Sequence, residues 1–198
     1  MELVLASGNR GKVREFQEAF GSELKALDEV ITPFYIEESA DTFAGNAVIK
    51  AKAVYEKVGN NYIVISDDSG ISVDALGGEP GIYSARYAGK GASDRDNLQK
   101  MINTLKSKGL DESKAHYTAS VAIISRYGIY VVHGWMYGKV IAEIRGDGGF
   151  GYDPAFIPDG FDKTLGELPS SVKSKFSHRT RAIKLAKPII DMLKNIKG

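Results

Sequence analysis

The sequence has 198 residues, of which 43% are hydrophobic and 26% are charged, and its formal net charge is +1. This balance is typical of a globular protein with one domain, and it excludes a globally basic nucleic-acid coat and an acidic disordered tail. Cysteine is absent, which excludes disulfide scaffolds, cysteine-ligated metal sites and thiol nucleophiles. The 22 glycines far outnumber the 6 prolines, and many of the glycines are bunched.

In chain order, the first third of the sequence predicts alternating strands and helices. Strands are expected where short apolar runs meet a turn, at 3–6 and 62–65. Helices are expected where apolar residues recur at helical spacing up to a closing glycine, at 12–20 and 43–58. Strand, helix and strand in this order indicate an α/β layer with some parallel pairing.

The middle of the chain predicts a loop, a helix and an antiparallel meander. Residues 77–93 are expected to form a long ordered loop, after which Ser93 or Asp94 caps a helix that ends near Lys108. Three strands are expected to follow, the first two joined by a hairpin, at 117–126, 129–137 and 140–144. Together with the parallel pairing, the meander predicts a mixed sheet.

The last helix is expected to run from His178 to about residue 196, with Pro188 kinking or splitting it. The whole chain, residues 1–198, is interpreted as one domain. The N-terminus lacks the features of a signal peptide, and no apolar run approaches the ~20 residues of a membrane helix. The sequence therefore predicts a cytoplasmic protein with no membrane partner.

A glycine-containing loop lies between the first predicted strand and the first predicted helix. It comprises six residues: Ser7, Gly8, Asn9, Arg10, Gly11 and Lys12. Free amides at a helix N-terminus favour an anion, and the two cations add charge, so the loop is a candidate phosphate site. It is not a Walker A loop, because Ala6 and Val13 stand where glycine and Ser/Thr are required. An ordinary strand–turn–helix connection remains the alternative.

Two groups of carboxylates are candidates for the functional site. Glu37 and Glu38 precede the second predicted helix, on which Lys50 lies beside the apolar stripe; on their own, they are better interpreted as a solvated acidic loop and a snorkelling lysine. Asp67 and Asp68 follow an apolar strand, where adjacent carboxylates suit Mg²⁺ and one of them can deprotonate water. The alternative for these aspartates is an ordinary turn.

Two later segments contain groups that could bind a base. In the glycine-rich segment 146–154, Phe150 could stack on a base and Asp153 could read it, unless the segment is simply a structural loop. Lys173, His178 and Arg179 lie at or just before the start of the last helix, where cations oppose the helix dipole unless an anion is near. A capped helix with a solvated basic first turn is the alternative. Combined, the segments describe hydrolysis of a nucleotide.

These residues lie in blocks that resemble the HAM1/RdgB-like inosine triphosphate pyrophosphatases, a family acting on non-canonical purine nucleoside triphosphates. The blocks, in order, are SGNRGKVREF (7–16), TFAGNAVIKAKA (42–53), SDDSGISVDALGGEPGIYSARYAG (66–89), GGFGYDP (148–154), KTLGEL (163–168) and SHRTRA (177–182). The resemblance implies an elongated two-lobed α/β subunit, with a central mixed twisted sheet flanked by helices and a cleft between the lobes. It also implies a homodimer.

The resemblance implies roles for residues in most of these blocks and for a few residues outside them. The loop from Ser7 to Lys12 would bind the triphosphate with help from Lys50, and Asp68 would be general base and Mg²⁺ ligand. Glu38 or Glu37 would complete the metal site, and Ser69 would touch the substrate. The base would be framed or read by Phe150, Gly151, Tyr152, Asp153, Lys173, His178 and Arg179. Many members have Glu before the Asn of the helix block, whereas this chain has Gly45 before Asn46, so that Glu's role cannot be carried over.

The implied reaction is Mg²⁺-dependent hydrolysis between the α and β phosphates of ITP, dITP or XTP, giving the monophosphate and pyrophosphate. Two alternatives are kept. One is a Maf-like pyrophosphatase acting on pyrimidine or modified nucleotides. The other is a non-catalytic nucleotide- or RNA-binding module, although the charge of +1 does not favour a nucleic-acid partner.

Overall fold

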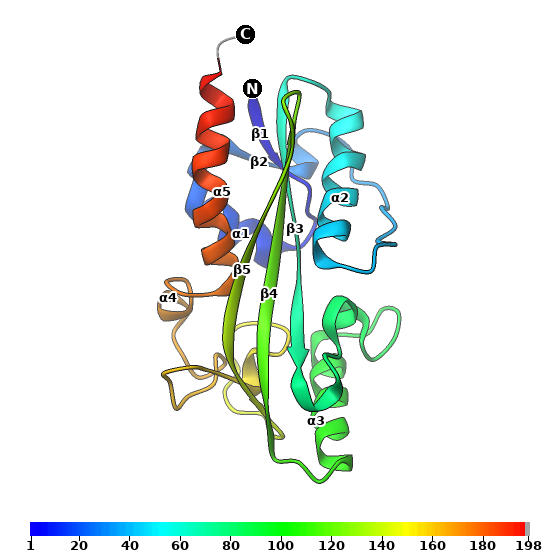
Figure 1. Cartoon of the computed structure of the whole chain (residues 1–198), viewed down its shortest axis with the longest axis vertical. Coiled ribbons are helices and arrows are strands. Elements are labelled where there is room, and N and C mark those ends of the chain that lie inside the picture. The colour runs from blue at the N-terminus through cyan, green and yellow to red at the C-terminus, as the bar shows by residue number, and fades with distance from the viewer. Residues whose placement is uncertain (197–198) are drawn as a thin grey trace. The chain divides into compact units, whose positions relative to one another are not determined.

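Six strands form one mixed sheet in the order β2-β1-β3-β4-β5-β6 (Figure 1). The structure is a computed structural model that describes residues 1–196. Its strands and helices are β1 (Glu2–Leu5), α1 (Arg10–Phe20), β2 (Leu24–Ala26), α2 (Phe43–Val58), β3 (Tyr62–Val73), α3 (Asp94–Ser107), β4 (Glu112–Ser125), β5 (Gly128–Ile141), β6 (Phe156–Pro158), α4 (Ser170–Lys173) and α5 (His178–Asn195). β1 pairs in parallel with β2 and β3, and β5 pairs antiparallel with β6. The predicted α/β class with a mixed sheet is confirmed.

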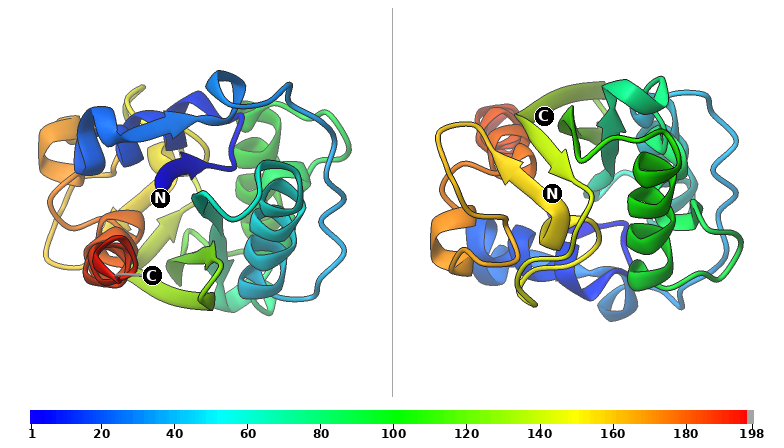
Figure 2. Two further views of the ribbon diagram at one scale, coloured as in Figure 1. Left: turned by 90° about the horizontal axis from the view of Figure 1, so that it is seen from above. Right: turned by 90° about the horizontal axis from the view of Figure 1, so that it is seen from below.

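The chain divides into two compact units. Unit 1 comprises Met1–Asp68, Ala119–Gly134 and the chain from Arg179 onward, and unit 2 comprises Ser69–Thr118 and Trp135–His178. In unit 1, α2 packs on one face of the strands and α1 and α5 pack on the other (Figures 1 and 2). Both interfaces are built from fully buried side chains, such as Ala51 on α2 and Ile190 on α5. This packing fixes the end of β1 that leads into the glycine-containing loop and the part of β3 that carries Asp67 and Asp68.

The helices of unit 1 begin and end where their capping residues stand. The side chain of Asn9 accepts hydrogen bonds from the amides of Gly11 and Lys12, so α1 begins two residues earlier than its apolar spacing predicts. Thr42 caps α2 in the same way, and Gly21 and Gly59 close the two helices as expected.

Unit 2 has its own core, in which α3 packs against the second half of β3 and against β4 and β5. The core includes Ile71 and Val73 from β3, and Met101 and Leu105 from α3, all four without exposed surface. The loop predicted at 77–93 contains a short 3₁₀ turn at Gly81–Arg86, and another at Asp74–Leu76 precedes it.

The N-terminus of α3 allows a direct test of capping. The Ser93 hydroxyl accepts from the Asp96 amide at 3.2 Å, and the Asp96 carboxylate accepts from the Ser93 amide at 2.9 Å. Ser93→Ala is expected to lower the free energy of unfolding by ~1 kcal/mol, as measured by urea denaturation. Ser107→Ala, at the other end of the same helix, is the matched control; an equal loss in both variants would contradict the capping role.

Three expectations about the elements were wrong. β3 does not end at Ile65 but continues through the aspartates to Val73. β5 continues through Gly138 to Ile141, so no separate strand exists at 140–144, and the strand that pairs with this part of β5 is β6. Of the two alternatives at Pro188, the split is wrong, because Pro188 lies inside one continuous helix; the kink stays a prediction. Pro188 and Lys184 both lie on the exposed face of α5, so water can satisfy the carbonyl that loses its partner.

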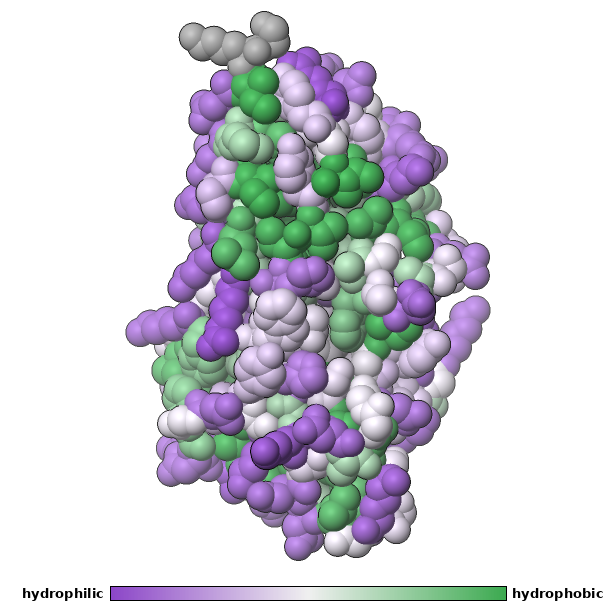
Figure 3. Space-filling view, viewed as in Figure 1, coloured by the Kyte–Doolittle hydropathy of each residue, from purple (hydrophilic) through white to green (hydrophobic). Residues whose placement is uncertain are grey.

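Exposed apolar side chains are found on α5 and on the adjoining end of β5, where Figure 3 shows hydrophobic residues gathered. Among them, Leu185 and Met192 of α5 and Ile129 of β5 are each about half exposed. Within residues 1–196, no helix is long and apolar enough to cross a membrane.

Candidate active site

The glycine-containing loop leads from β1 into the first turn of α1, as the sequence predicts. Gly8, Asn9 and Arg10 are exposed, and Ser7, Gly11 and Lys12 are half-buried. The loop is internally bonded, since Ser7 Oγ accepts from the Asn9 amide at 3.2 Å and Asn9 Oδ1 from the Gly11 amide at 2.9 Å. Two of the amides expected to be open to an anion are therefore already capped by Asn9. The helix dipole still gives this end of α1 a partial positive charge.

Asp67 is the centre of a buried charge network in unit 1. Its Oδ2 atom lies 2.7 Å from Lys12 Nζ and 3.3 Å from Arg179 Nε. Arg179 also donates from Nη1 to Glu15 at 2.6 Å, and its side chain is only 1% exposed. Burial alone would raise the pKa of Asp67, but Arg179 and Lys12 outweigh it and hold this pKa well below the usual range.

Two consequences follow for the predicted residues. Arg179, expected to read the base, lies in unit 1 and is held by two carboxylates, Asp67 and Glu15. Asp67, which the sequence offered with Asp68 as a candidate Mg²⁺ carboxylate, holds Lys12 beside the loop through both its carboxylate and its carbonyl oxygen. Burial lowers the pKa of Lys12 more than its contact with Asp67 raises it.

Lys50 brings two carboxylates together. Its Nζ atom, on α2, lies 3.0 Å from Asp68 Oδ1 on β3 and 3.2 Å from Glu38 Oε1. Burial raises the pKa of Asp68, and the nearby charges of Lys50 and Lys12 only partly oppose this effect. The second carboxylate oxygen of Asp68, Oδ2, is buried and accepts no hydrogen bond from the described residues. A buried carboxylate oxygen in this state is available to a ligand, a metal ion or a water.

The same geometry distinguishes the two glutamates before α2. Glu37 is exposed, whereas Glu38 is half-buried and lies beside Lys50. We call Lys50, Asp68 and Glu38 the Lys50 group. Among residues 1–196, no three His, Asp or Glu side chains cluster as a complete metal site. A pair of carboxylates nevertheless fits Mg²⁺, which usually takes one or two protein carboxylates and completes its shell with water and substrate phosphates.

The segment that carries Glu38 is held against the first turn of α2. Asn46 Oδ1 accepts from the Ala40 amide at 3.0 Å. Gly45 lies directly beneath Ala40, so that a Cβ atom at position 45 would come within 2.5 Å of the Ala40 Cβ. This close approach explains why glycine occupies a position that otherwise lowers helix stability.

In unit 2, residues 146–153 form a loop that we call the aromatic loop. Asp153 Oδ2 lies 2.5 Å from Lys173 Nζ and accepts from the Phe150 amide at 2.9 Å. Lys173 Nζ in turn lies 4.5 Å from the centre of the Phe150 ring. Lys173, from the short helix α4, and Asp153 are both buried. Phe150, Asp153 and Lys173, which were predicted to frame or read the base, are thus brought together.

His178, another predicted base residue, adjoins this group through Tyr117. The His178 ring stacks on Tyr117, with centroids 4.7 Å apart and planes 11° from parallel. Tyr117 donates to Asp153 Oδ1 at 3.4 Å, and burial together with the Asp153 charge raises the pKa of Tyr117 well above its usual value. Ser69, the first residue of unit 2, is half-buried on β3.

The aromatic loop is also tied to the segment before α3. Tyr152 donates from its hydroxyl to the Ser84 carbonyl at 2.8 Å, and the Gly151 amide donates to Asp94 at 2.9 Å. Sequence reasoning gave Tyr117, Ser84 and Asp94 no role in the candidate site, because no local pattern marks a residue whose partner lies tens of positions away.

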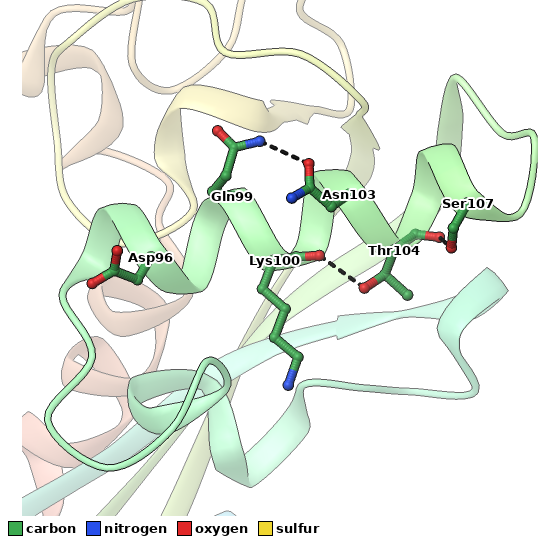
Figure 4. Close-up of a pocket in the computed structure, with 6 residues that line it drawn as sticks. All are labelled: Asp96, Gln99, Lys100, Asn103, Thr104 and Ser107. Atoms are coloured by element: carbon green, nitrogen blue, oxygen red, sulfur yellow. Dashed lines mark hydrogen bonds between the residues drawn. The ribbon is translucent and has the colours of Figure 1, made fainter.

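A separate hollow of about 430 Å³ lies along the polar face of α3 (Figure 4). Its polar side chains bond to their own helix: Gln99 to Asn103 at 2.9 Å, and Thr104 to the Lys100 carbonyl at 2.8 Å. Lys100 extends to the Tyr87 carbonyl and ring. The hollow therefore offers little to a charged ligand, unlike the Lys50 group.

Comparison with known proteins identifies the family. The model of the Ham1 family matches residues 3–189. This chain belongs to the Ham1 family. The resemblance inferred from the six sequence blocks is thereby confirmed, and the match does not favour a Maf-like enzyme.

Ham1 relatives match over nearly the whole length. A dITP/XTP pyrophosphatase of Sulfurovum sp. is 58% identical over 98% of this chain and 96% of its own length. One of Nautilia profundicola is 53% identical over 98% of this chain and 100% of its own length. The Staphylococcus aureus Ham1 protein has a TM-score of 0.86 at 37% identity, covering 96% of this chain and 98% of that chain.

Proposed function

We propose that this Ham1 chain hydrolyses non-canonical purine nucleoside triphosphates, such as dITP, XTP and ITP, to the monophosphate and pyrophosphate. The names of its curated relatives support this activity and substrate class. The observation that carries the proposal is the Lys50 group: Asp68 is buried, retains an unengaged oxygen, and lies beside a second carboxylate and two lysines.

Lys50, Lys12 and the end of α1 bind the triphosphate in this proposal. Lys50 and Lys12 are held in place by carboxylates before any substrate arrives, so little reorganisation is needed when negative charge develops on the departing pyrophosphate. The exposed Arg10 adds further positive potential.

Asp68 is the proposed general base. It accepts a proton from the water whose oxygen attacks the α-phosphorus, while the bond from that phosphorus to the bridging oxygen breaks and pyrophosphate leaves. Burial that raises the pKa of Asp68 makes it a stronger base than an exposed aspartate. Glu38 and Asp68 would hold Mg²⁺, which supplies polarisation of the phosphoryl oxygens and acidification of bound water.

Lys173 and Phe150 are the proposed contacts of the base. The Lys173 ammonium group has three N–H donors, and one of them is directed to Asp153. The other donors can bind the 6-oxo group of hypoxanthine or xanthine. Adenine presents a 6-amino donor instead, and an unpaired buried polar group costs ~1–3 kcal/mol. This cost corresponds to roughly 5- to 150-fold discrimination against ATP.

The test is a panel of nucleoside triphosphates assayed for pyrophosphate release, with Mg²⁺ and with EDTA. dITP, XTP and ITP are expected to react at least ~5-fold faster than ATP, and EDTA is expected to abolish release. Equal rates for ITP and ATP would remove the proposed selectivity, and orthophosphate as the product would remove cleavage between the α and β phosphates. Preference for dTTP or dUTP would favour the Maf-like alternative.

The proposal also includes a cytoplasmic homodimer, which rests on the family resemblance. Light scattering of the purified chain is expected to give twice the mass of 21.5 kDa. A monomer mass at every concentration tested would contradict the dimer.

A further inference from the structure

The block KTLGEL (163–168) belongs to the family resemblance but has no role in the proposed mechanism. In the structure it follows β6 and returns to the aromatic loop of unit 2. We call residues 164–167 the clasp. Thr164, Leu165 and Gly166 are buried, whereas Glu167 is exposed. A loop segment with a buried backbone needs specific partners for its polar groups.

The backbone of the clasp bonds to both ends of the aromatic loop. The Gly166 carbonyl accepts from the Gly148 amide at 2.9 Å, and the Gly166 amide donates to the Asp153 carbonyl at 3.0 Å. Phe150 lies between these two positions in the chain. Gly166 therefore fixes the peptide on each side of the ring proposed to stack on the base.

The contact is too close for any side chain at its centre. A Cβ atom on Gly166 would come within 2.8 Å of the Arg145 carbonyl oxygen and 2.9 Å of Pro154 Cα. From the opposite side, a Cβ atom on Gly146 would come within 2.3 Å of the Gly166 carbonyl. Because these neighbours are backbone atoms, they can yield only if the aromatic loop moves.

Glu167 fixes the clasp from the exposed side. Its Oε2 atom accepts from the Thr164 amide at 2.8 Å and from Arg145 Nε at 3.2 Å. Arg145 is the residue just before the aromatic loop, and its carbonyl accepts from Thr164 Oγ1 at 2.6 Å. The hydrogen bonds from Thr164 lower the pKa of Glu167, so the carboxylate is ionised at neutral pH.

We propose that the clasp positions the base-recognition group, with Gly166 and Glu167 as positioning residues for Asp153, Lys173 and Phe150. The bonds of the clasp end on the peptides of Gly148 and Asp153, and Asp153 is the residue that holds Lys173 and the Phe150 amide. A displacement of the clasp therefore moves the donor of Lys173 and the Phe150 ring together. The inference rests on the proposed function, because it concerns recognition of the base.

The test compares Glu167→Ala and Gly166→Ala with the wild type, using kcat and KM for dITP and dATP and inhibition by pyrophosphate. Misplacement by about 1 Å can lower a rate ~100-fold, so kcat/KM for dITP is expected to fall ~10- to 100-fold, mainly through KM. The preference for dITP over dATP is expected to shrink, because the misplaced Lys173 no longer favours a 6-oxo over a 6-amino group. Inhibition by pyrophosphate is expected to stay unchanged, because the residues proposed to bind phosphate are in unit 1.

Two further variants separate positioning from general loss of structure. Lys163→Ala, an exposed neighbour in the same segment, is expected to behave as the wild type. Glu167→Gln keeps an oxygen acceptor for the Thr164 amide and is expected to restore most of the kcat/KM lost in Glu167→Ala. An equal loss of kcat on both nucleotides, with KM and the dITP preference intact, would show a merely structural role and overturn the inference.

If Gly166→Ala does not fold, Glu167→Ala carries the test alone, because it changes only an exposed side chain. Wild-type protein that releases no pyrophosphate from dITP would instead contradict the proposed function. Active wild-type protein with an unaffected Glu167→Ala variant would contradict the clasp while leaving the proposed function intact.

Discussion

Exchange of Asp68 for asparagine is expected to lower kcat for pyrophosphate release by ~10²- to 10⁴-fold, the usual contribution of a general base. Asparagine has nearly the same shape and keeps an oxygen that can accept from Lys50, which now donates to Asp68 Oδ1 at 3.0 Å. It cannot take a proton from water at neutral pH. The chemical step should therefore fail while the pocket around Lys50 stays intact.

Two measurements complete this test. Calorimetric titration with ITP in the presence of Mg²⁺ is expected to show binding by the Asp68→Asn variant, because Lys12 and Lys50 remain. Asp74→Asn, an exposed acid just after the same strand, is the matched control and is expected to keep full activity. Normal hydrolysis by Asp68→Asn would show that the base is another group or that the site lies elsewhere.

The local structure around Asp68 was only partly predictable. Caps and closing glycines set the helix ends, and Gly21, Gly59 and Ser93 act as their types predict. Asp67 and Asp68 were expected to follow the strand, because acidic and small residues usually mark turns. They lie inside β3 instead, since Lys12, Arg179 and Lys50 compensate their charge. Those partners come from three other elements, which no local pattern reveals.

The chemistry of the candidate site was easier to predict than its pairings. Lys50, Asp68 and Glu38 were each singled out, and the structure adds that one ammonium group joins both carboxylates. For Arg179 the residue was singled out but its neighbours were not. A cation at the start of a helix indicates that an anion lies nearby. It does not indicate whether that anion is a bound ligand or a buried aspartate.

The many glycines of the chain are needed for two different structural reasons. Gly21 and Gly59 have positive φ angles of +62° and +79°, which glycine adopts readily, and no atom of another segment lies within 4 Å of the place of a Cβ atom. Gly45 and Gly166 are needed for a different reason, because backbone or Cβ atoms of other segments lie where their side chains would be. Composition shows the surplus, but only the tertiary structure separates conformational glycines from those required by close contact.

The buried network around Asp67 leads to the largest expected change in stability. Arg179→Met keeps the length and apolar contacts of the side chain but removes the charge that compensates Asp67 and Glu15. Both Arg179 and Asp67 have at most 1% of their side-chain surface exposed. Removing one partner of a buried ion pair usually costs ~3–5 kcal/mol, because the other charge stays buried without compensation. Urea denaturation is expected to show a loss of this size.

A double-mutant cycle shows whether the loss comes from Asp67. Asn at position 67 needs no cation, and Lys12 is partly exposed and can reach water. The Arg179→Met, Asp67→Asn double variant is therefore expected to be more stable than the sum of the two single losses predicts. Lys25→Met, which breaks the exposed pair with Glu2, is the control and is expected to change stability little. If Arg179→Met were no more destabilising than Lys25→Met, the network would not be a buried one in solution, and Arg179 would be available to bind a substrate.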